Sequence, residues 1–514
     1  MSDSTLLRNL EICIQHGKWC LIENVGEDLD PALEPILLKQ VDKSGMLRLG
    51  DKSIPWSKDF KFFMTTTIPN PHYAPETQVK VTVLNFAITP YGLEEQMLNQ
   101  FVSQELPDLQ KRKDQIVQLN AQSARQLRDI EEAILHGLTK NKQISDILNS
   151  DELINVLDES KEVSDEISGR LAESAITEKE IDEKRETFRP VAFRASILFF
   201  AIVDLAVIDP MYQYSLQWFS NLFGGSVDNS GKSDNSQQRI KNLNDHFTLS
   251  LYENVCRSLF EAHKLLFSLT LTIKILFGAE QMDASELRFF LAGPSGEVKI
   301  EPNPTLWLGD LEWAETYKQL FKMSELLPSL KGIDKFFIEN NKAFQEIYDS
   351  NEPHNMPLPG VWNENVNSFQ KMIILKCIRP DKITFSVKNF IMEHLGKAFV
   401  EPPLFSLSKS FKDSSITTPL IFVLSAGSDP VEDFKRFAEE MNMSKKTQEI
   451  SLGRGQGVKA EVMISDNLTR GGWVLLMNCH LAVSWMPKLE QIVENMDDTK
   501  HRDFRLWLTS MPNK

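Results

Sequence analysis

The chain has 514 residues, of which 42% are hydrophobic and 25% are charged. This is the composition of folded globular protein, and the length predicts about three or four domains rather than one core. The chain contains 56 Lys and Arg against 72 Asp and Glu, which gives a net charge of −16. So acidic a chain argues against sequence-independent binding of DNA or RNA.

The five cysteines are scattered, odd in number and never in a C-x-x-C spacing. This pattern excludes a disulfide framework, argues against a zinc site and predicts a reducing cytosolic setting. The first residues show neither the basic nor the apolar region of a signal peptide. The longest apolar stretch, 195–208, is short and contains Asp204, so it predicts a buried helix rather than a membrane span.

Residues 1–93 have a mixed α/β pattern that ends near the breaker Pro69-Asn70-Pro71. Apolar residues recur at helical spacing in two segments, and short apolar or alternating runs indicate strands in three others. The expected helices are 6–14 and 33–41, and the expected strands are 19–22, 60–67 and 79–87.

Residues 94–188 are dense in charge and contain one Pro and two Gly between positions 93 and 188. Apolar residues recur along two arms, and the polar stretch 139–151 between them is expected to turn the chain. The pattern predicts an antiparallel helical hairpin whose arms of about 35 residues would each reach about 50 Å. Two long helices folded into a compact bundle remain the alternative. The residues expected at the seam between the arms are Ile116, Leu127, Ile130, Ile167 and Leu171.

Residues 189–293 are apolar and helical in pattern, with an expected exposed loop at 224–238 and a break at 294–304. The remainder, 294–514, begins helical and becomes α/β. Strands that alternate with helices predict a parallel sheet. The expected strands are 372–377, 419–424, 473–477 and 505–508.

A P-loop ATPase needs a strand, a glycine-rich turn with a lysine, and a helix whose first amides face phosphate. The strand 419–424 leads into a glycine-containing turn in which Asp429 is an expected helix N-cap and Pro430 the first helical residue. No lysine follows Gly427, and Asp429 would repel a polyphosphate. We therefore predict that Gly427, Ser428 and Asp429 form a capped strand-to-helix turn, with a weak anion site as the alternative.

A second strand should end in an Asp that binds Mg²⁺ and a Glu that activates water. At the end of 473–477 the corresponding pair is Met477-Asn478 or Asn478-Cys479, and neither offers a carboxylate. In the N-terminal region Glu23 could reach a metal through water, but Asn24 cannot accept a proton. The phosphate loop for that region would lie upstream of this chain. We predict neither a catalytic residue nor a metal site.

Two further segments have competing interpretations. Thr65-Thr66-Thr67 and Asn70 follow a strand where a polar sensor residue could stand, but turn chemistry beside Pro69 and Pro71 is favoured. Residues 451–457 (SLGRGQG) lack the GxGxxG spacing and do not obviously follow a strand, so a flexible turn is favoured over a dinucleotide site.

The segments resemble dynein heavy chains, most closely the axonemal type, across essentially the whole length. The segments 23–27 (ENVGE) and 65–73 (TTTIPNPHY) are similar to the fifth AAA+ module. The segments 425–430 (SAGSDP), 451–457 and 478–487 (NCHLAVSWMP) are similar to the sixth, with Ala426, Arg454 and Met477 replacing a usual proline, glutamine and glutamine. The most specific match is 189–192 (RPVA), 196–200 (SILFF) and 208–216 (IDPMYQYSL).

The resemblance implies degenerate, P-loop NTPase-like AAA+ modules with a helical lid and an antiparallel coiled-coil hairpin. Residues 1–93 would be the C-terminal part of the fifth large subdomain, and 94–188 the strut, or buttress. Residues 189–293 would be the helical small subdomain of the fifth module. Residues 294–514 would be the sixth module, which the chain leaves before its end.

The resemblance also implies a function. The chain would be the non-hydrolysing part of a motor ring that passes ATP-driven motion through the strut to the microtubule-binding stalk, in a minus-end-directed motor of the ciliary axoneme. ATP and Mg²⁺ would be bound elsewhere in the parent ATPase, and no cofactor is expected here. The expected partners are the other heavy-chain modules and stalk, intermediate and light chains, and the microtubule through the parent protein, without nucleic acid or membrane. An autonomous ATPase and a truncated coiled-coil scaffold in a ciliary assembly without a motor role are the competing classes.

Overall fold

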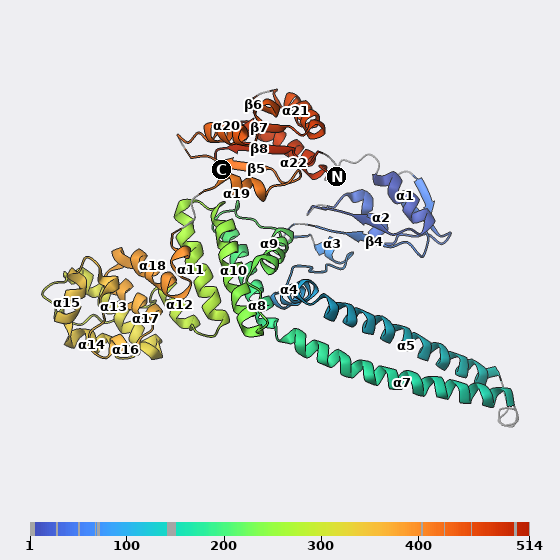
Figure 1. The fold of residues 1–514 in the computed structure, drawn as a ribbon, viewed down its shortest axis with the longest axis horizontal. Coiled ribbons are helices and arrows are strands. Elements are labelled where there is room, and N and C mark those ends of the chain that lie inside the picture. The colour runs from blue at the N-terminus through green and yellow to red at the C-terminus, as the bar shows by residue number, and fades with distance from the viewer. Residues whose placement is uncertain are drawn as a thin grey trace. The chain divides into compact units, whose positions relative to one another are not determined.

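The computed structural model describes residues 6–26, 29–49, 52–66, 68, 72–73, 75–140, 151–401, 405–425, 427–453, 455–497 and 501–512. Side chains at 76–77, 130–131, 133–140, 151–160, 162, 164 and 173 lie outside this description. The chain falls into two compact units, residues 1–92 and 93–514, and each is described by itself (Figure 1).

The first unit is a small α/β layer around an apolar core that includes Leu10, Ile14, Leu33 and Leu47. Strand β1 (Cys20–Ile22) pairs in parallel with β4 (Phe62–Met64), and β2 (Met46–Leu49) pairs antiparallel with β3 (Lys52–Pro55). The sequence did not predict the short β2–β3 pair. The helices of the unit are α1 (Leu6–His16), α2 (Glu34–Leu37) and α3 (Pro75–Gln78).

Two expectations for this unit were wrong. The predicted helix 33–41 is a 3-10 turn followed by α2, which ends at Leu37, and Lys39 already has a left-handed backbone. The predicted strand 79–87 is not a strand, and Val79, Val83 and Phe86 are exposed. Alternation predicts a strand only when a neighbouring strand supplies backbone partners, and none of the described strands pairs with this segment.

Two long helices dominate one part of the second unit. Helix α4 (Pro90–Glu105) leads into α5 (Pro107–Lys140), and α7 (Asp151–Glu186) runs back beside α5 in the opposite direction (Figure 1). The predicted turn 139–151 falls almost entirely outside the described residues.

A group of helices follows α7: α8 (Arg189–Val203), α9 (Leu216–Asn229), α10 (Ser236–Cys256), α11 (Glu261–Gly278) and α12 (Ala284–Ala292). Helix α8 packs against α10 and α11, and α9 packs against α10. Among the described residues, one stretch, 189–207, has the length and composition of a membrane span, and half of its apolar window is buried inside the protein. Core helices of globular proteins have the same composition, and the packing of α8 is that of a core helix.

The exposed loop expected at 224–238 is confirmed only for residues 230–235, and the rest of that prediction was wrong. Helix α9 runs through Gly224 and Gly225 to Asn229, and only 230–235 separate it from α10. Gly224 is buried, and a Cβ there would stand only 2.9 Å from Nε2 of Gln104 on α4. The glycine that suggested a loop in fact permits close helix packing.

The next part is helical from α13 to α18. The bounds are α13 (Asp310–Leu326), α14 (Ile333–Glu339), α15 (Asn341–Asp349), α16 (Trp362–Asn365), α17 (Ser368–Ile378) and α18 (Ile383–His394). The predicted strand 372–377 was wrong, because it lies inside α17, which a capping box of Asn367 and Gln370 begins. A short continuous apolar run fits a buried strand and a buried helix equally well.

The C-terminal part is a four-stranded parallel sheet in the order β5-β8-β7-β6. Helix α20 packs its phenylalanines on one face against Trp473 and Trp507, and α21 and α22 cover the other face around Val474 and Leu506. Three of the four strands of this sheet were predicted from the sequence. The fourth, β6, was missed because its sequence, TQEIS, is polar. The strands are β5 (Leu420–Val423), β6 (Thr447–Ser451), β7 (Trp473–Met477) and β8 (Arg505–Ser510), and the helices are α19 (Leu407–Lys412), α20 (Val431–Glu440), α21 (Gly457–Arg470) and α22 (Met486–Glu494).

Candidate functional site

The carboxyl ends of β5 to β8 meet at one edge of the sheet, where open parallel sheets bind ligands. After β5, the loop closes on itself: Ser428 Oγ accepts the Ser425 N–H at 3.1 Å and donates to the Ser425 carbonyl at 2.8 Å. Gly427 has φ +86°, and Asp429 Oδ1 accepts the Val431 N–H at 2.9 Å. Helix α20 begins at Val431, as predicted, and Pro430 rather than Asp429 stands at its N-cap. The Asp429 carboxylate therefore accepts the hydrogen bond of a first-turn N–H that a bound phosphate would need.

Asn478 ties three strand ends together. Its backbone lies in the left-handed region, with φ 59°. Its N–H donates to Thr509 Oγ1 at 3.1 Å after β7, and its side-chain Nδ2 donates to Ser451 Oγ at 3.0 Å at the end of β6. The side chain thus fixes the loops and offers no carboxylate to a metal or a water molecule.

In the first unit, backbone hydrogen bonds hold together the segments that follow β1 and β4. Asn24 follows β1 with φ 55°, the Thr65 N–H donates to the Ile22 carbonyl at 2.9 Å, and the Val25 N–H donates to the Thr65 carbonyl at 2.9 Å. Glu23 is exposed between Ile22 and Asn24, and Asn70 lies outside the described residues. The position of Asn24 matches that of Asn478, so Glu23-Asn24 corresponds to Met477-Asn478.

The donor set does not fit Mg²⁺ with ATP in a hydrolysing site. The residues after Gly427 are Ser428, Asp429 and Pro430, without the cation that a phosphate loop needs. The strand-end residue Asn478 uses its amide on Ser451. Within the described ranges, no group of three or more His, Cys, Asp and Glu side chains could hold a metal ion.

The glycine-rich segment 451–457 does follow a strand, which corrects the sequence interpretation, because it connects β6 to α21. The Leu452 N–H donates to the Met477 carbonyl at 2.8 Å, so the segment stays on the sheet beyond β6. Gly457 begins α21 where a Cβ would stand 2.7 Å from the Trp485 ring. That glycine permits close packing of the indole.

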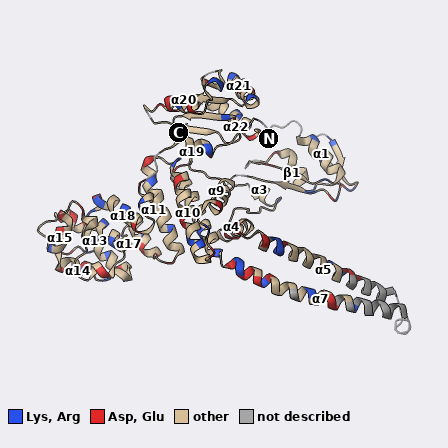
Figure 2. Cartoon of the chain, viewed as in Figure 1, with Lys and Arg blue, Asp and Glu red and all other residues tan. Residues whose placement is uncertain are grey.

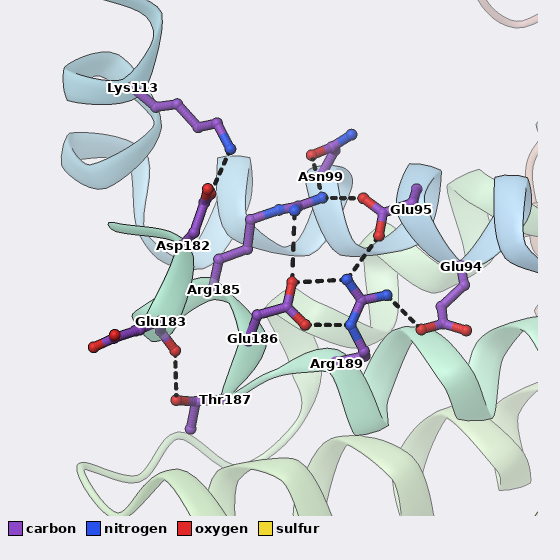
Figure 3. Close-up of polar contacts among 10 residues, drawn as sticks. All are labelled: Glu94, Glu95, Asn99, Lys113, Asp182, Glu183, Arg185, Glu186, Thr187 and Arg189. Carbon is purple, nitrogen blue, oxygen red and sulfur yellow. Dashed lines mark hydrogen bonds and ion pairs between the residues drawn. The ribbon is translucent and has the colours of Figure 1, made fainter. Parts of the chain in front are cut away.

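The base of the α5–α7 pair holds a network of arginines and carboxylates (Figure 3). Arg189, the first residue of α8, places Nη1 2.6 Å from Glu94 Oε1 and Nη2 2.7 Å from Glu95 Oε1, both on α4. The same guanidinium bonds both oxygens of Glu186 at the end of α7. These carboxylates hold the pKa of Arg189 above its usual range.

Arg185 adds a second set of contacts one helical turn earlier. Its Nη2 lies 2.5 Å from Glu95 Oε2 and donates to Asn99 Oδ1 at 3.1 Å. Glu95 therefore binds two arginines, and hydrogen bonding from Arg185 is the largest of the effects that hold its pKa below the ordinary value, with Arg189 adding to it. Charged residues of both signs continue along α7 near this base (Figure 2).

A second ion-pair network lies where α4 ends. Arg239 on α10 is buried, and its Nε lies 2.8 Å from Glu105 Oε1. Lys232 Nζ lies 2.6 Å from Glu105 Oε2, and Arg239 Nη1 also donates to Ser230 Oγ at 2.7 Å. Burial alone would raise the pKa of Glu105, but hydrogen bonds from Arg239 and Lys232 outweigh it and lower that pKa.

The expected seam residues lie on the two long helices. Ile167 is fully buried, whereas Ile116, Leu127 and Leu171 are partly buried. The side chain of Ile130 lies outside the described residues. Nearer the base, Lys113 Nζ on α5 lies 2.6 Å from Asp182 Oδ1 on α7.

Comparison with known proteins gives the family. Residues 1–167 match the model of the ATP-binding dynein motor region, and residues 415–514 match that of the dynein heavy chain region D6 P-loop domain. The chain is 47% identical to dynein axonemal heavy chain 1 of Rattus norvegicus over 519 aligned residues. This alignment covers 100% of the chain and 11% of that relative. The chain is 45% identical over 520 residues to dynein axonemal heavy chain 3 of Homo sapiens, which covers 100% of the chain and 12% of the relative. The chain belongs to the axonemal dynein heavy-chain family.

A more distant dynein relative is the dynein-1-beta heavy chain of the flagellar inner arm I1 complex of Chlamydomonas reinhardtii, at 38% identity over 517 residues, 99% of the chain and 11% of the relative. The chain spans only 11% to 12% of the length of these relatives. The axonemal resemblance is confirmed, and the α/β and helical content fits the P-loop-like AAA+ class. Axonemal dynein membership indicates the cytoskeleton of the cilium as its location.

Proposed function

We propose that this chain is the non-hydrolysing part of a dynein motor ring and transmits ATP-driven motion to the microtubule-binding stalk. In this proposal, residues 1–93 and 189–293 belong to the fifth AAA+ module, 94–188 form the strut, and 294–514 belong to the sixth module. The observation that carries the proposal is the α5–α7 pair, whose base is bonded to α4 through Arg185 and Arg189. A pair of long helices bonded at its base suits a mechanical element.

The strand ends support a role without hydrolysis. Asn24 and Asn478 stand where a base is needed, and the loop at Gly427 has no lysine. We therefore assign no cofactor to this chain and place ATP and Mg²⁺ elsewhere in the parent motor. The other heavy-chain modules, the intermediate and light chains, and the microtubule are its proposed partners.

The proposed mechanism is rigid-body coupling. Rotation of the fifth and sixth modules, driven by ATP elsewhere in the ring, would pull the strut against the stalk and change microtubule affinity. This requires the two arms to act as one antiparallel coiled coil. The buried Ile167 at their contact, with Ile116, Leu127, Ile130 and Leu171, would hold the arms together.

Substitution of a seam residue in the full-length heavy chain tests this mechanism. Ile167 is 0% exposed, so Ile167→Asp places a carboxylate between the arms and should abolish ATP-dependent release from microtubules while leaving ATP binding intact. Ile176→Asp on the same helix is the matched control, because Ile176 is 63% exposed. Co-sedimentation with microtubules, with and without ATP, measures the effect. Normal release by Ile167→Asp would exclude the strut mechanism.

An antibody against residues 94–188 separates the motor proposal from the scaffold alternative. In denatured ciliary protein, we expect it to detect a band far larger than a 514-residue chain, with peptides of an ATP-hydrolysing dynein module in that band. A lone band at the size of 514 residues would instead favour a scaffold without a motor role.

A further inference from the structure

Helix α4 is bonded to the helical group that follows the α5–α7 pair. Gln100 Nε2 donates to the Ser220 carbonyl at 2.8 Å, and Ser220 Oγ donates back to Gln100 Oε1 at 2.5 Å. Gly224 on α9 lies so close that a Cβ would stand 3.1 Å from Gln100 Nε2. At the far end of α4, Glu105 pairs with the buried Arg239 of α10. These contacts make α4 part of the α8–α11 group.

The two arms are attached to α4 in different ways. Arm α5 continues from it almost without interruption, since the Leu106 N–H donates to the Val102 carbonyl at 2.9 Å and the Gln110 N–H to the Leu106 carbonyl at 3.2 Å. Arm α7 has no such backbone link to α4. It runs into α8 through residues 187 and 188, where the Phe188 N–H donates to the Arg185 carbonyl at 3.0 Å, and side chains near its end reach α4 across space. The ring of Phe188 lies 5.0 Å from that of Phe101 on α4.

The arginines Arg185 and Arg189 supply the polar part of that attachment (Figure 3). Arg189 uses three nitrogens on three carboxylates, Glu94, Glu95 and Glu186, and so bridges α4, α8 and the end of α7. A planar guanidinium can do this, whereas the point charge of a lysine cannot fork in this way.

Two of these side chains are largely buried, unlike those of ordinary surface ion pairs, which contribute little, whereas Arg189 and Glu186 are 30% and 44% exposed. The side chain of Arg185 is 11% exposed and that of Glu94 is 14% exposed. Arg170 and Glu166, further along α7, are 57% and 68% exposed with 3.5 Å between their charged atoms, and they lie on one helix. They provide a matched surface pair that joins no second element.

We propose that Arg185 and Arg189 are positioning residues that clamp the end of α7 to α4, so that both arms turn with the α8–α11 group as one lever. The inference rests on the proposed strut function and deepens it, because it identifies where the motion enters the strut. Without the clamp, α5 would still follow α4, whereas α7 would be joined to the group only by its short connection to α8, and its end would slip relative to α5.

The test is hydrogen exchange of the full-length heavy chain, read by mass spectrometry on peptides that cover residues 180–192. Arg189→Met should speed amide exchange there by about tenfold or more, while peptides from α10 and α11 stay unchanged. Arg189→Lys should restore only part of the protection, since it keeps the charge and loses the fork. Arg170→Met is the control and should leave the peptides unchanged.

Unchanged exchange in Arg189→Met would overturn the clamp. If exchange rises throughout α8 and α10, Arg189 also supports the fold, and Glu94→Gln then decides: a rise confined to 180–192 supports the clamp, and no rise overturns it. Microtubule co-sedimentation separates the two proposals. Faster exchange with normal ATP-dependent release from microtubules would support the clamp proposal and exclude the strut mechanism. In an ATPase assay of the same variant, loss of microtubule-stimulated activity with normal basal activity would support both proposals.

Discussion

At the scale of single residues, the strand ends are built for rigidity. Asn24 and Asn478 both adopt left-handed backbone conformations, which asparagine tolerates better than most residues. The sequence identified these positions because strand, turn and polar residue lie next to one another in the chain. It did not identify the backbone conformation or the bond from Asn478 to Ser451, because 27 residues separate those partners.

Substitution of Asn478 separates the two roles of that residue. Asn478→Ala should lower the free energy of unfolding by about 2 kcal/mol, because it adds left-handed backbone strain and removes the bond to Ser451. Asn478→Gly removes the same bond without the strain and should cost about 1 kcal/mol less than Asn478→Ala. Urea unfolding followed by the fluorescence of the buried Trp473 and Trp507 measures both. Equal losses would show that the left-handed backbone contributes nothing.

Arg239→Met should be among the most damaging single substitutions. Arg239 is 2% exposed, and its loss leaves Glu105 partly buried without the guanidinium, at a cost of about 3–5 kcal/mol. The pKa of Glu105 should then rise, since burial is the largest effect on it and would be offset only by Lys232. Arg170→Met, which opens an exposed pair, should cost no more than about 0.5 kcal/mol. Thermal unfolding monitored by circular dichroism compares the two variants.

At the scale of elements, local pattern predicted the helical regions and three strands of the sheet but failed where tertiary contacts decide. The run 372–377 is apolar apart from Lys376 and too short to show a period, and in the structure it lies inside helix α17. Gly224 looked like a loop residue, and its role appears only when α4, more than 100 residues away, lies against it. The arginine network was missed for the same reason, because Arg189 and Glu94 are 95 positions apart.

Two adjacent glycines of α9 should respond differently to alanine. Gly225→Ala should stabilise the protein by about 0.5–1 kcal/mol, because alanine favours the helix and no atom lies within 4 Å of its Cβ. Gly224→Ala gains the same helix preference but displaces the amides of Gln104 and Gln100 and loses a bond to Ser220, at about 1 kcal/mol. Thermal unfolding of both variants tests the difference. A Gly224→Ala variant as stable as Gly225→Ala would contradict the close packing of α4.

The clamp should weaken in acid. The pKa values of Glu95 and Glu186 are lowered in the folded protein, mainly by hydrogen bonds from Arg185 and Arg189 respectively. A lowered folded pKa contributes stability above the ordinary value of 4.5, and that contribution is lost as the pH falls through the folded pKa. The difference in unfolding free energy between the wild type and Glu95→Gln should therefore be constant above about pH 5 and shrink below it. A difference that persists at low pH would mean that the glutamine acts through packing.

At the scale of the whole molecule, the sequence predicted the family and the general α/β and helical character, because dynein motifs recur along the full length. It did not predict how the helices of the second unit use α4 as a common support. Each contact of α4 contributes only modestly to stability. The attachment of α4 to the neighbouring helices depends on all of these contacts together.

The chain as a whole should hydrolyse no ATP. With Mg²⁺ and ATP, phosphate release by the purified 514-residue chain should not exceed the buffer background, since neither sheet edge offers a lysine and a general base together. A matched preparation with Asn478→Glu should also be inactive, because the carboxylate alone does not supply the missing lysine. Turnover above background by the wild-type chain would revive the autonomous ATPase interpretation.

The sharing of Glu95 between Arg185 and Arg189 has a consequence for how the base of the α5–α7 pair separates from α4 under load. Removal of either arginine leaves the carboxylate less firmly oriented for the other, so the two attachments reinforce each other. The joint should hold firmly up to a threshold force and then release both arginines together, without a stable half-open position. Excess load on the α5–α7 pair would therefore show as abrupt slippage at its base rather than as gradual bending.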